Sequence, residues 1–166
     1  MTRDQRFVAL HRGGSLDDER HRLLADWAAD CAEHVLPFFT RAHPGDDRPG
    51  LAIEATRAWS RGEISVGAAR KAASRAHAAA RETSDGAARA AARAAGQAVS
   101  TPHMADHSLG AAAYAVRAAR RAAVDQDGSA AGEREGRWQR DRLPAPVREL
   151  VVSAQDAKSV LGDGEA

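Results

Sequence analysis

The residues best suited to chemistry lie in the stretch 101–107, Thr-Pro-His-Met-Ala-Asp-His. A threonine followed by a proline is typical of the first turn of a helix, so the sequence predicts that a helix begins at 101–102. On such a helix His103 and His107 stand one turn apart, with Asp106 beside them. This stretch is therefore the first candidate for a functional site, although polar side chains at the start of a helix need no function.

Two imidazoles one turn apart can share a divalent metal ion if other helices supply further ligands. The candidate ligands for such a site are Cys31, His34, His77, His103 and His107. The pattern is weak, because it has neither the Cys-x-x-Cys pairs of a structural zinc site nor a glutamate between the two histidines. The same histidines otherwise form a buried polar network with Glu54, Asp30 or Asp106 that fixes the helix register. We predict no cofactor, and Cys31 alone is typical of a small buried side chain.

A small-molecule pocket is the alternative use of these residues. If the chain is an enzyme, the candidate catalytic residues are His77, His103, Asp106, His107 and Glu54. The candidate walls of a ligand pocket are Trp27, Asp30, Glu54, Arg57, Trp59 and Tyr114. Glu54 and Arg57 can instead pair with each other on their own helix. No nucleophile elbow, phosphate-binding loop or dinucleotide fingerprint accompanies these residues, so the sequence favours a binding role over catalysis.

Helices rich in alanine must position these residues. Alanine is the commonest residue of the chain and the best helix former, and no sustained alternation of apolar and polar residues predicts strands. The sequence therefore predicts an all-α fold, a single-domain helical bundle of about five main helices plus a C-terminal helical segment. The predicted helices cover 15–36, 49–60, 65–81, 87–100, 101–124 and 133–142, with a short segment at 147–152.

The boundaries of the domain follow from the same pattern. We expect a flexible N-terminus at 1–14, the helical domain at 15–153 and a frayed acidic tail at 154–166. Pro37 is expected to end or bend the first helix, and residues 125–136 to form a loop. The first and fifth helices are expected in the core. The residues expected to be largely buried are Trp27, Cys31, His77, His107 and Tyr114.

The net charge is +1, so no overall field attracts nucleic acid or an acidic membrane. The charge is nevertheless uneven, because residues 55–124 carry 11 basic and 4 acidic side chains while both ends of the chain are acidic. Most of these basic residues are arginines, which suit bidentate contacts to carboxylates. They form either a solvated face or a surface for an acidic partner, including the acidic ends of this chain. Nucleic-acid binding is the weaker interpretation, because aromatic residues do not alternate with the arginines.

The cysteine content and the N-terminus indicate where the protein acts. A single cysteine excludes an internal disulfide framework. The first residues lack the apolar core of a signal peptide, and no apolar run approaches the length of a membrane span. We therefore expect a cytoplasmic protein that contacts no membrane. Its alanine-rich faces are compatible with a homodimer.

Several short strings occur in an order that resembles a known family. They are Asp26–His34, Asp47–Pro49, Ala52–Ala55, Arg57–Trp59, Ala76–Arg81, Ala95–Val99, His103–His107 and Gly110–Tyr114. Over most of its length the chain is thus similar to the bacterial "putative immunity protein" family, a small helical domain likened to the immunity proteins of polymorphic toxin systems. The resemblance implies a protein that binds and neutralises a cognate toxin by occlusion. It carries over no catalytic residues.

Overall fold

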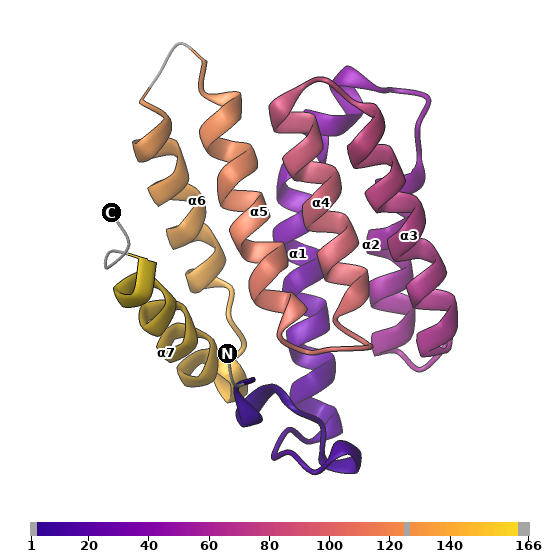
Figure 1. The fold of residues 1–166 in the computed structure, drawn as a ribbon, viewed down its shortest axis with the longest axis vertical. Helices are drawn as coiled ribbons and strands as arrows, with labels where there is room; N and C mark the ends of the chain where they lie inside the picture. Colours follow the sequence, from indigo (N-terminus) through magenta and orange to yellow (C-terminus); the bar gives the residue numbers. More distant parts are fainter. Residues whose placement is uncertain (1–2, 125–126, 163–166) are drawn as a thin grey trace.

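The computed structural model describes residues 3–124 and 127–162 of the chain. This part contains seven α-helices, two short 3-10 helices and no β-strand, so the predicted all-α fold is confirmed with more helices than expected. The 3-10 helices are η1 (Gln5–Phe7) and η2 (Leu10–Arg12). The α-helices are α1 (Asp18–Ala42), α2 (Arg48–Ser60), α3 (Val66–Glu82), α4 (Gly86–Ser100), α5 (His107–Ala122), α6 (Gly128–Asp141) and α7 (Ala145–Gly162) (Figure 1). None of the described helices is both long and apolar enough to cross a membrane.

Helix α4 lies at the centre of the bundle. It packs against α1, α2, α3 and α5, and Figure 1 shows α1 and α2 behind the layer that α3, α4 and α5 form. Every side chain that α4 buries is Ala, Gly or Val, and such small groups let helix axes approach closely. The large side chains of the core come mostly from α1, among them Leu24, Trp27, Val35 and Phe39. The expectation that the first and fifth helices lie in the core therefore holds, because α5 packs against α1, α4 and α6, and α4 is a further central helix.

Side-chain caps explain where two of the helices begin. Helix α3 is capped by Ser65, whose Oγ accepts a hydrogen bond from the N–H of Ala68. Helix α1 begins later than expected. Its cap is Asp17, whose carboxylate accepts from the N–H of Arg20, and Ser15 precedes the helix.

Pro37 does not end α1, because the helix continues to Ala42. A proline inside a helix removes one backbone hydrogen bond and leaves a carbonyl without its partner. Pro37 is exposed, so water can reach that part of the backbone. Beyond it Phe39 is buried, and the burial of its ring stabilises the last turn by about 2 kcal/mol.

Helices α6 and α7 are both longer than expected. Helix α6 begins at Gly128 instead of residue 133, because the side chain of Asp127 caps it. Residues 125–126, at the start of the expected loop, lie outside the described residues, as do residues 163–166 of the expected tail. Helix α7 has Pro146 in its first turn, where a proline is tolerated, and it continues through residues that we expected to be frayed. The buried stripe that holds it is Val147, Val151 and Ala154.

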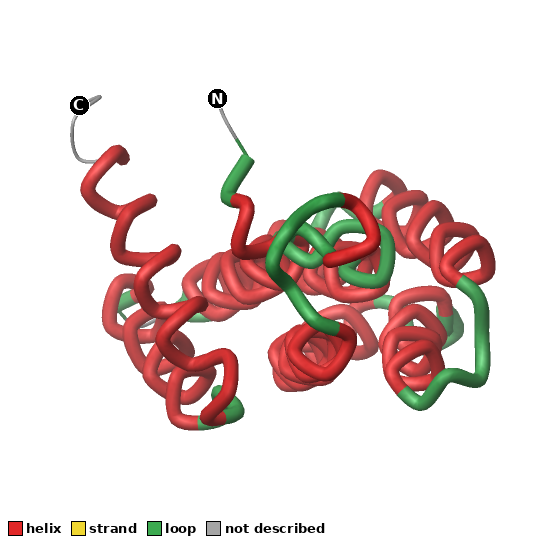
Figure 2. Tube along the Cα trace, turned by 90° about the horizontal axis from the view of Figure 1, so that it is seen from below, coloured by secondary structure: helices red, strands yellow, loops and turns green. Residues whose placement is uncertain are grey.

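The N-terminal segment, expected to be flexible, is packed over residues 3–14. Phe7 is 1% exposed and belongs to the core. Gly14 lies so close to the backbone of Val8 that a Cβ atom would clash with the Val8 carbonyl. Figure 2 shows η1 and α7 on the same side of the bundle, and Arg6 Nη1 donates a hydrogen bond to Ser153 Oγ at 2.8 Å. The two ends of the described chain therefore support each other.

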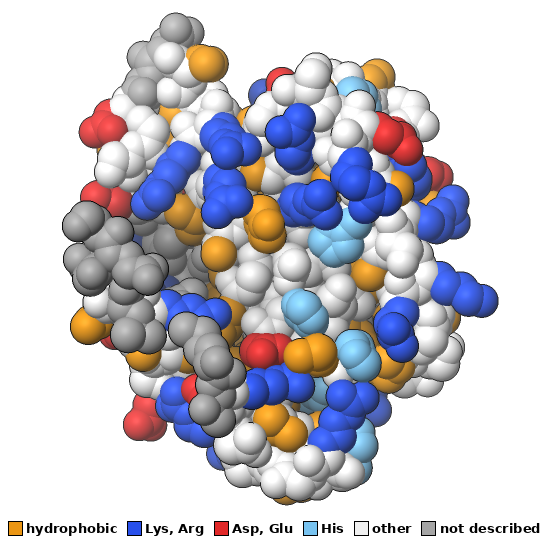
Figure 3. Space-filling model, in the orientation of Figure 1, with side chains coloured by type: hydrophobic (Ala, Val, Ile, Leu, Met, Phe, Trp, Pro, Cys, Tyr) orange, Lys and Arg blue, Asp and Glu red, His pale blue; other side chains and the backbone are white. Residues whose placement is uncertain are grey.

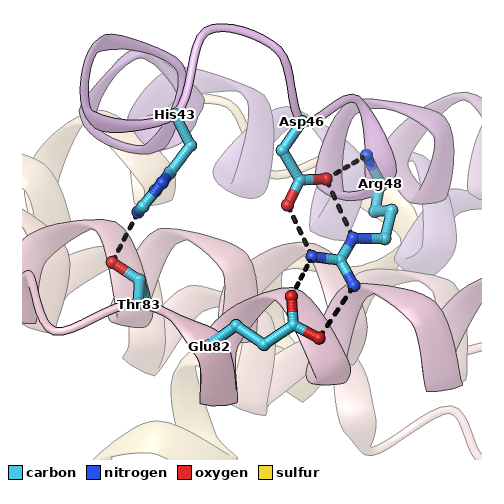
Figure 4. A network of polar contacts seen from close by, with 5 residues as sticks. All are labelled: His43, Asp46, Arg48, Glu82 and Thr83. Carbon is cyan, nitrogen blue, oxygen red and sulfur yellow. Dashed lines mark hydrogen bonds and ion pairs between the residues drawn. The ribbon is translucent and has the colours of Figure 1, made fainter.

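A polar network fixes the loop between α1 and α2 against the end of α3 (Figure 4). Arg48 Nη2 donates to Asp46 Oδ2 at 2.7 Å and to Glu82 Oε2 at 2.6 Å. These hydrogen bonds from the guanidinium lower the pKa values of both carboxyl groups. His43 Nε2 lies 2.6 Å from Thr83 Oγ1 in the same network. As a result, the only acidic residue of α3 is neutralised by an arginine of α2.

Candidate functional site

The predicted helix start at 101–102 is a turn, and α5 begins at His107. Thr101 is buried at the end of α4, where its N–H and its hydroxyl both donate to carbonyls of the last turn of that helix. The threonine therefore ends one helix instead of capping the next. His103 lies in the turn, so it does not share a helix face with His107, and the expected pair one turn apart is wrong.

His77 and His107 nevertheless reach one face of the bundle from two helices. Arg93 Nη1 donates to His77 Nδ1 at 2.9 Å, and His107 Nδ1 lies 2.7 Å from Gln97 Oε1. Arg93 and Gln97 are one turn apart on α4, so these four residues tie α3, α4 and α5 together. We call them the polar seam. Both imidazoles are half-buried, less than the sequence predicted.

Two glycines let the polar seam lie close against the helices. A Cβ atom on Gly96 would stand 2.5 Å from Cε1 of His77. A Cβ atom on Gly110 would stand 2.6 Å from Oε1 of Gln97, which accounts for a glycine inside α5 despite its low helix propensity.

The pKa values of both histidines of the polar seam are lowered, which favours the neutral imidazole. Burial lowers the pKa of His77, and the nearby charges of Arg93 and Arg81 lower it further. Burial also lowers the pKa of His107, and the carboxylate of Asp106 opposes that effect. The two rings therefore act as hydrogen-bonding groups that hold three helices in register.

The outer parts of α3, α4 and α5 carry a strong positive charge. We define the basic face by the basic side chains of these helices, Arg70, Lys71, Arg75, Arg81, Arg89, Arg93, Arg117, Arg120 and Arg121. Within the described residues, no carboxylate lies within 4 Å of any of them. Figure 3 shows Lys and Arg side chains in a band across the upper half of this side of the molecule, with histidines next to it.

The residues expected to line a central pocket do not all come together, although Arg57 and Asp30 are in contact. Trp27 is buried, and its Nε1 donates to the carbonyl of Gln139 at 2.9 Å. Arg57 Nη2 donates to Asp30 of α1 at 2.8 Å, so Arg57 pairs with another helix and not with Glu54 of its own. Glu54 is exposed.

The other two expected walls of that pocket lie apart from each other. Trp59 packs against His21, with ring centroids 4.8 Å apart, below the N-terminal segment. Tyr114 is half-buried on α5, where the guanidinium of Arg117 lies 4.9 Å from its ring centroid. The single pocket predicted from these aromatic residues is therefore not formed.

The candidate metal ligands also remain separate. His34 contacts α6, whereas His77 and His107 belong to the polar seam. Among the residues that the structure describes, no three His, Cys, Asp or Glu side chains stand close enough together to hold a metal ion. Cys31 is fully buried as expected, and burial raises the pKa of its thiol well above the usual value, with a smaller contribution from Glu135.

A groove that the sequence did not predict lies between α1, α5 and α6, with a volume of about 480 Å³. At its polar end, His34 Nδ1 stands 2.7 Å from Oε2 of Glu135. The side chain of His34 is 40% exposed and that of Glu135 only 5%. Gln139 Nε2 donates to the other oxygen of Glu135 at 3.1 Å. The buried carboxylate is thus held from two sides, and it orients the imidazole.

Aromatic rings form the walls of this groove. Trp138 stacks on His34 with centroids 3.7 Å apart and planes 2° apart, and Arg142 Cζ lies 4.0 Å from the centroid of the Trp138 ring. Phe38 contributes the second aromatic wall. The sequence analysis singled out His34 but missed Glu135, because nothing local joins them. The available signal was a polar stripe of glutamate and glutamine one turn apart on a helix that also carries a tryptophan.

Comparison with protein families gives a match over most of the chain. The model of a family described as Imm-5 like putative immunity protein matches residues 14–146. The match spans α1 to α6 and includes the polar seam, the basic face and the groove. No curated protein and no solved structure matches the chain.

Proposed function

Because the chain belongs to the Imm-5 like putative immunity protein family, we propose that it neutralises a cognate toxin by stoichiometric binding. The toxin is a product of the same bacterium, and the complex forms in the cytoplasm. Inhibitors of this kind cover the surface that the toxin needs for its activity. Charge complementarity then gives speed and specificity to the encounter.

The basic face is the observation that supports this proposal beyond the family membership. It gathers nine cationic side chains on three helices, and no carboxylate of the described residues neutralises them. A surface with one sign of charge attracts a partner of the opposite sign and raises the association rate. Arginine also suits recognition of carboxylates and is enriched among the residues that dominate binding energy. We therefore propose that the basic face contacts an acidic surface of the toxin.

The polar seam makes the basic face a rigid one. The bonds of Arg93 and Gln97 join α4 to both neighbouring helices, and the glycines beneath them leave little free space. A preformed surface loses less conformational entropy on binding than a mobile one.

Coexpression with the product of each neighbouring gene tests the proposal. We expect one product that stops growth when expressed alone, that is recovered with this chain in a 1:1 complex, and whose toxicity the full chain relieves. If no neighbour is either bound or relieved, the proposed function is wrong.

The groove favours a second candidate function, small-molecule binding or an enzyme activity. It combines a histidine, a carboxylate and two aromatic walls, the features expected of such a pocket, although on other residues than the sequence indicated. Screening small molecules by thermal shift tests this function. A ligand of the groove must lose affinity when Trp138→Ala removes a wall, while the exposed Arg137→Ala on the same helix must leave it unchanged. Growth relief that survives Trp138→Ala would separate the groove from toxin neutralisation.

A further inference from the structure

A cavity below the N-terminal segment uses residues of the 101–106 turn that the proposed function leaves aside. It has a volume of about 100 Å³ and lies between the N-terminal segment, α1, α2 and this turn. One water needs only roughly 10–15 Å³, so the cavity has room for a small ion. Its apolar walls are Phe7, Trp59 and Pro102.

Basic and imidazole side chains dominate the polar lining of this cavity. They are Arg3, His11, Arg12, His21 and His103, and one carboxylate, Asp18, lies with them. Burial lowers the pKa of His103, and the positive charges of Arg70, Arg12 and Arg3 lower it further. Arg70 of α3 therefore also lies near His103. Arg3 and Arg12 outnumber the single carboxylate of the lining, Asp18, so the cavity has a small excess of positive charge, which favours an anion.

Arg3 presents a hydrogen-bond donor with no acceptor. Its Nη2 donates to Asp106 Oδ1 at 3.3 Å, which fixes the guanidinium at the cavity wall. Its Nε–H is buried and has no acceptor among the described residues. Buried donors are nearly always paired, so this unpaired donor beside the cavity supports a bound acceptor, which it reaches after a small rotation of the Arg3 side chain because it has almost no accessible surface here. His21 differs, because its Nε2 already lies 2.8 Å from the carbonyl oxygen of Thr101.

We propose that this cavity binds a small oxyanion, a phosphate or a carboxylate group, through Arg3, Arg12 and His103. Guanidinium groups match the oxygens of both anions in geometry and charge, and the imidazole supplies a further N–H. Asp106 is a positioning residue for Arg3 and does not itself contact the anion. Of the basic face only Arg70 lies near this site, so occupancy of the cavity can be measured without a toxin.

The test is binding of inorganic phosphate, and separately of acetate, to the full chain in isothermal titration and thermal shift. Sodium chloride at equal ionic strength is the reference. We expect a saturable rise in the melting temperature with at least one of the two anions. Phosphate alone would identify a tetrahedral anion, acetate alone a carboxylate, and both an unselective oxyanion site.

Variants connect that binding to the cavity. Arg3→Gln is expected to weaken binding at least tenfold, and so is Arg12→Gln, whose exposed side chain can be replaced without a threat to folding. The control Arg20→Gln removes an equal charge from α1 outside the cavity and should change the dissociation constant less than twofold. Absence of saturable binding by the wild-type chain, or an equal loss in the control, overturns the proposal.

Discussion

Glu135 lies 2.7 Å from His34 and is buried, whereas His34, which covers it, is exposed to solvent over 40% of its side chain. The two residues join α1 to α6 across 101 positions of sequence. A buried carboxylate is costly unless its oxygens are hydrogen-bonded, and the imidazole of His34 supplies one of the hydrogen bonds to Glu135.

Removal of His34 should therefore destabilise the fold. His34→Ala is expected to lower the free energy of unfolding by about 1–3 kcal/mol, because Glu135 then keeps only its bond from Gln139. Adding Glu135→Gln in the same chain should recover part of that loss, since it removes the buried charge. Urea unfolding of the wild type, both single variants and the double variant measures the coupling. Strictly additive losses would show that the pair does not interact.

Replacement by alanine should change stability in opposite directions at Gly96 of α4 and at Gly136 of α6. Gly96→Ala places a Cβ atom 2.5 Å from His77, so repacking should lower stability by about 1–3 kcal/mol despite the better helix propensity. Gly136→Ala meets nothing within 4 Å and should raise stability by up to about 1 kcal/mol. Thermal and urea unfolding measure both. A Gly96→Ala variant more stable than the wild type would mean that the His77 side chain can move aside at little cost in free energy.

If the proposed toxin binds the basic face, charge reversal on that face should slow their association. Arg81→Glu combined with Arg117→Glu is expected to reduce the association rate at low salt by about tenfold or more, because electrostatic attraction acts mainly on that rate. The matched control is Arg134→Glu combined with Arg137→Glu on α6, which changes net charge equally. Surface plasmon resonance at two ionic strengths separates the effects. Equal slowing by both pairs would assign the effect to net charge and not to the basic face.

The thiol of Cys31 should be inert in the folded protein. Burial raises its pKa, and the side chain has no exposure, so neither thiolate nor access is available for reaction. A disulfide reagent at about pH 8 should react at the rate of protein opening, and quickly once urea unfolds the chain. Rapid stoichiometric labelling without urea would contradict this burial.

Stability should fall as the solution becomes moderately acidic. The pKa values of four histidines, His21, His77, His103 and His107, are lowered first of all by burial. Below the usual value of 6.5 the unfolded chain takes up protons that the folded chain still refuses, so the unfolded state gains. Stability is therefore full above this pH and is lost as the pH falls towards the lowered values. Urea unfolding at about pH 7.5 and about pH 5.5 checks the sign, and a more stable protein at the lower pH would refute it.

Helix positions and the helical fold class follow from local chemistry, which is why the sequence predicts them well. Alanine content and the Ser65 cap act within a few residues. Thr101 shows where this reasoning ends. A threonine before a proline suits a helix start, but here its side chain bonds backward to α4, and the competing bond decides the boundary.

The candidate site depends on pairs between distant helices, which local patterns do not specify. His34 contacts Glu135 only because α1 and α6 pack in a particular register. In the same way, the packing of α2 on α1 lets Arg57 pair with Asp30 instead of Glu54. The polar seam was predicted in part. The sequence indicated His77 and His107 as partners in one network, but it did not indicate Arg93 and Gln97, which connect them through α4.

A centre built from Ala, Gly and Val has a consequence for how the chain can evolve. Such a helix tolerates almost no enlargement, because each added methyl group meets a neighbouring backbone at close range. Exposed arginines without such contacts, Arg75 and Arg81 among them, take no part in that packing and can be exchanged one at a time. Substitutions of surface residues can therefore change which partner the protein recognises while the fold stays the same.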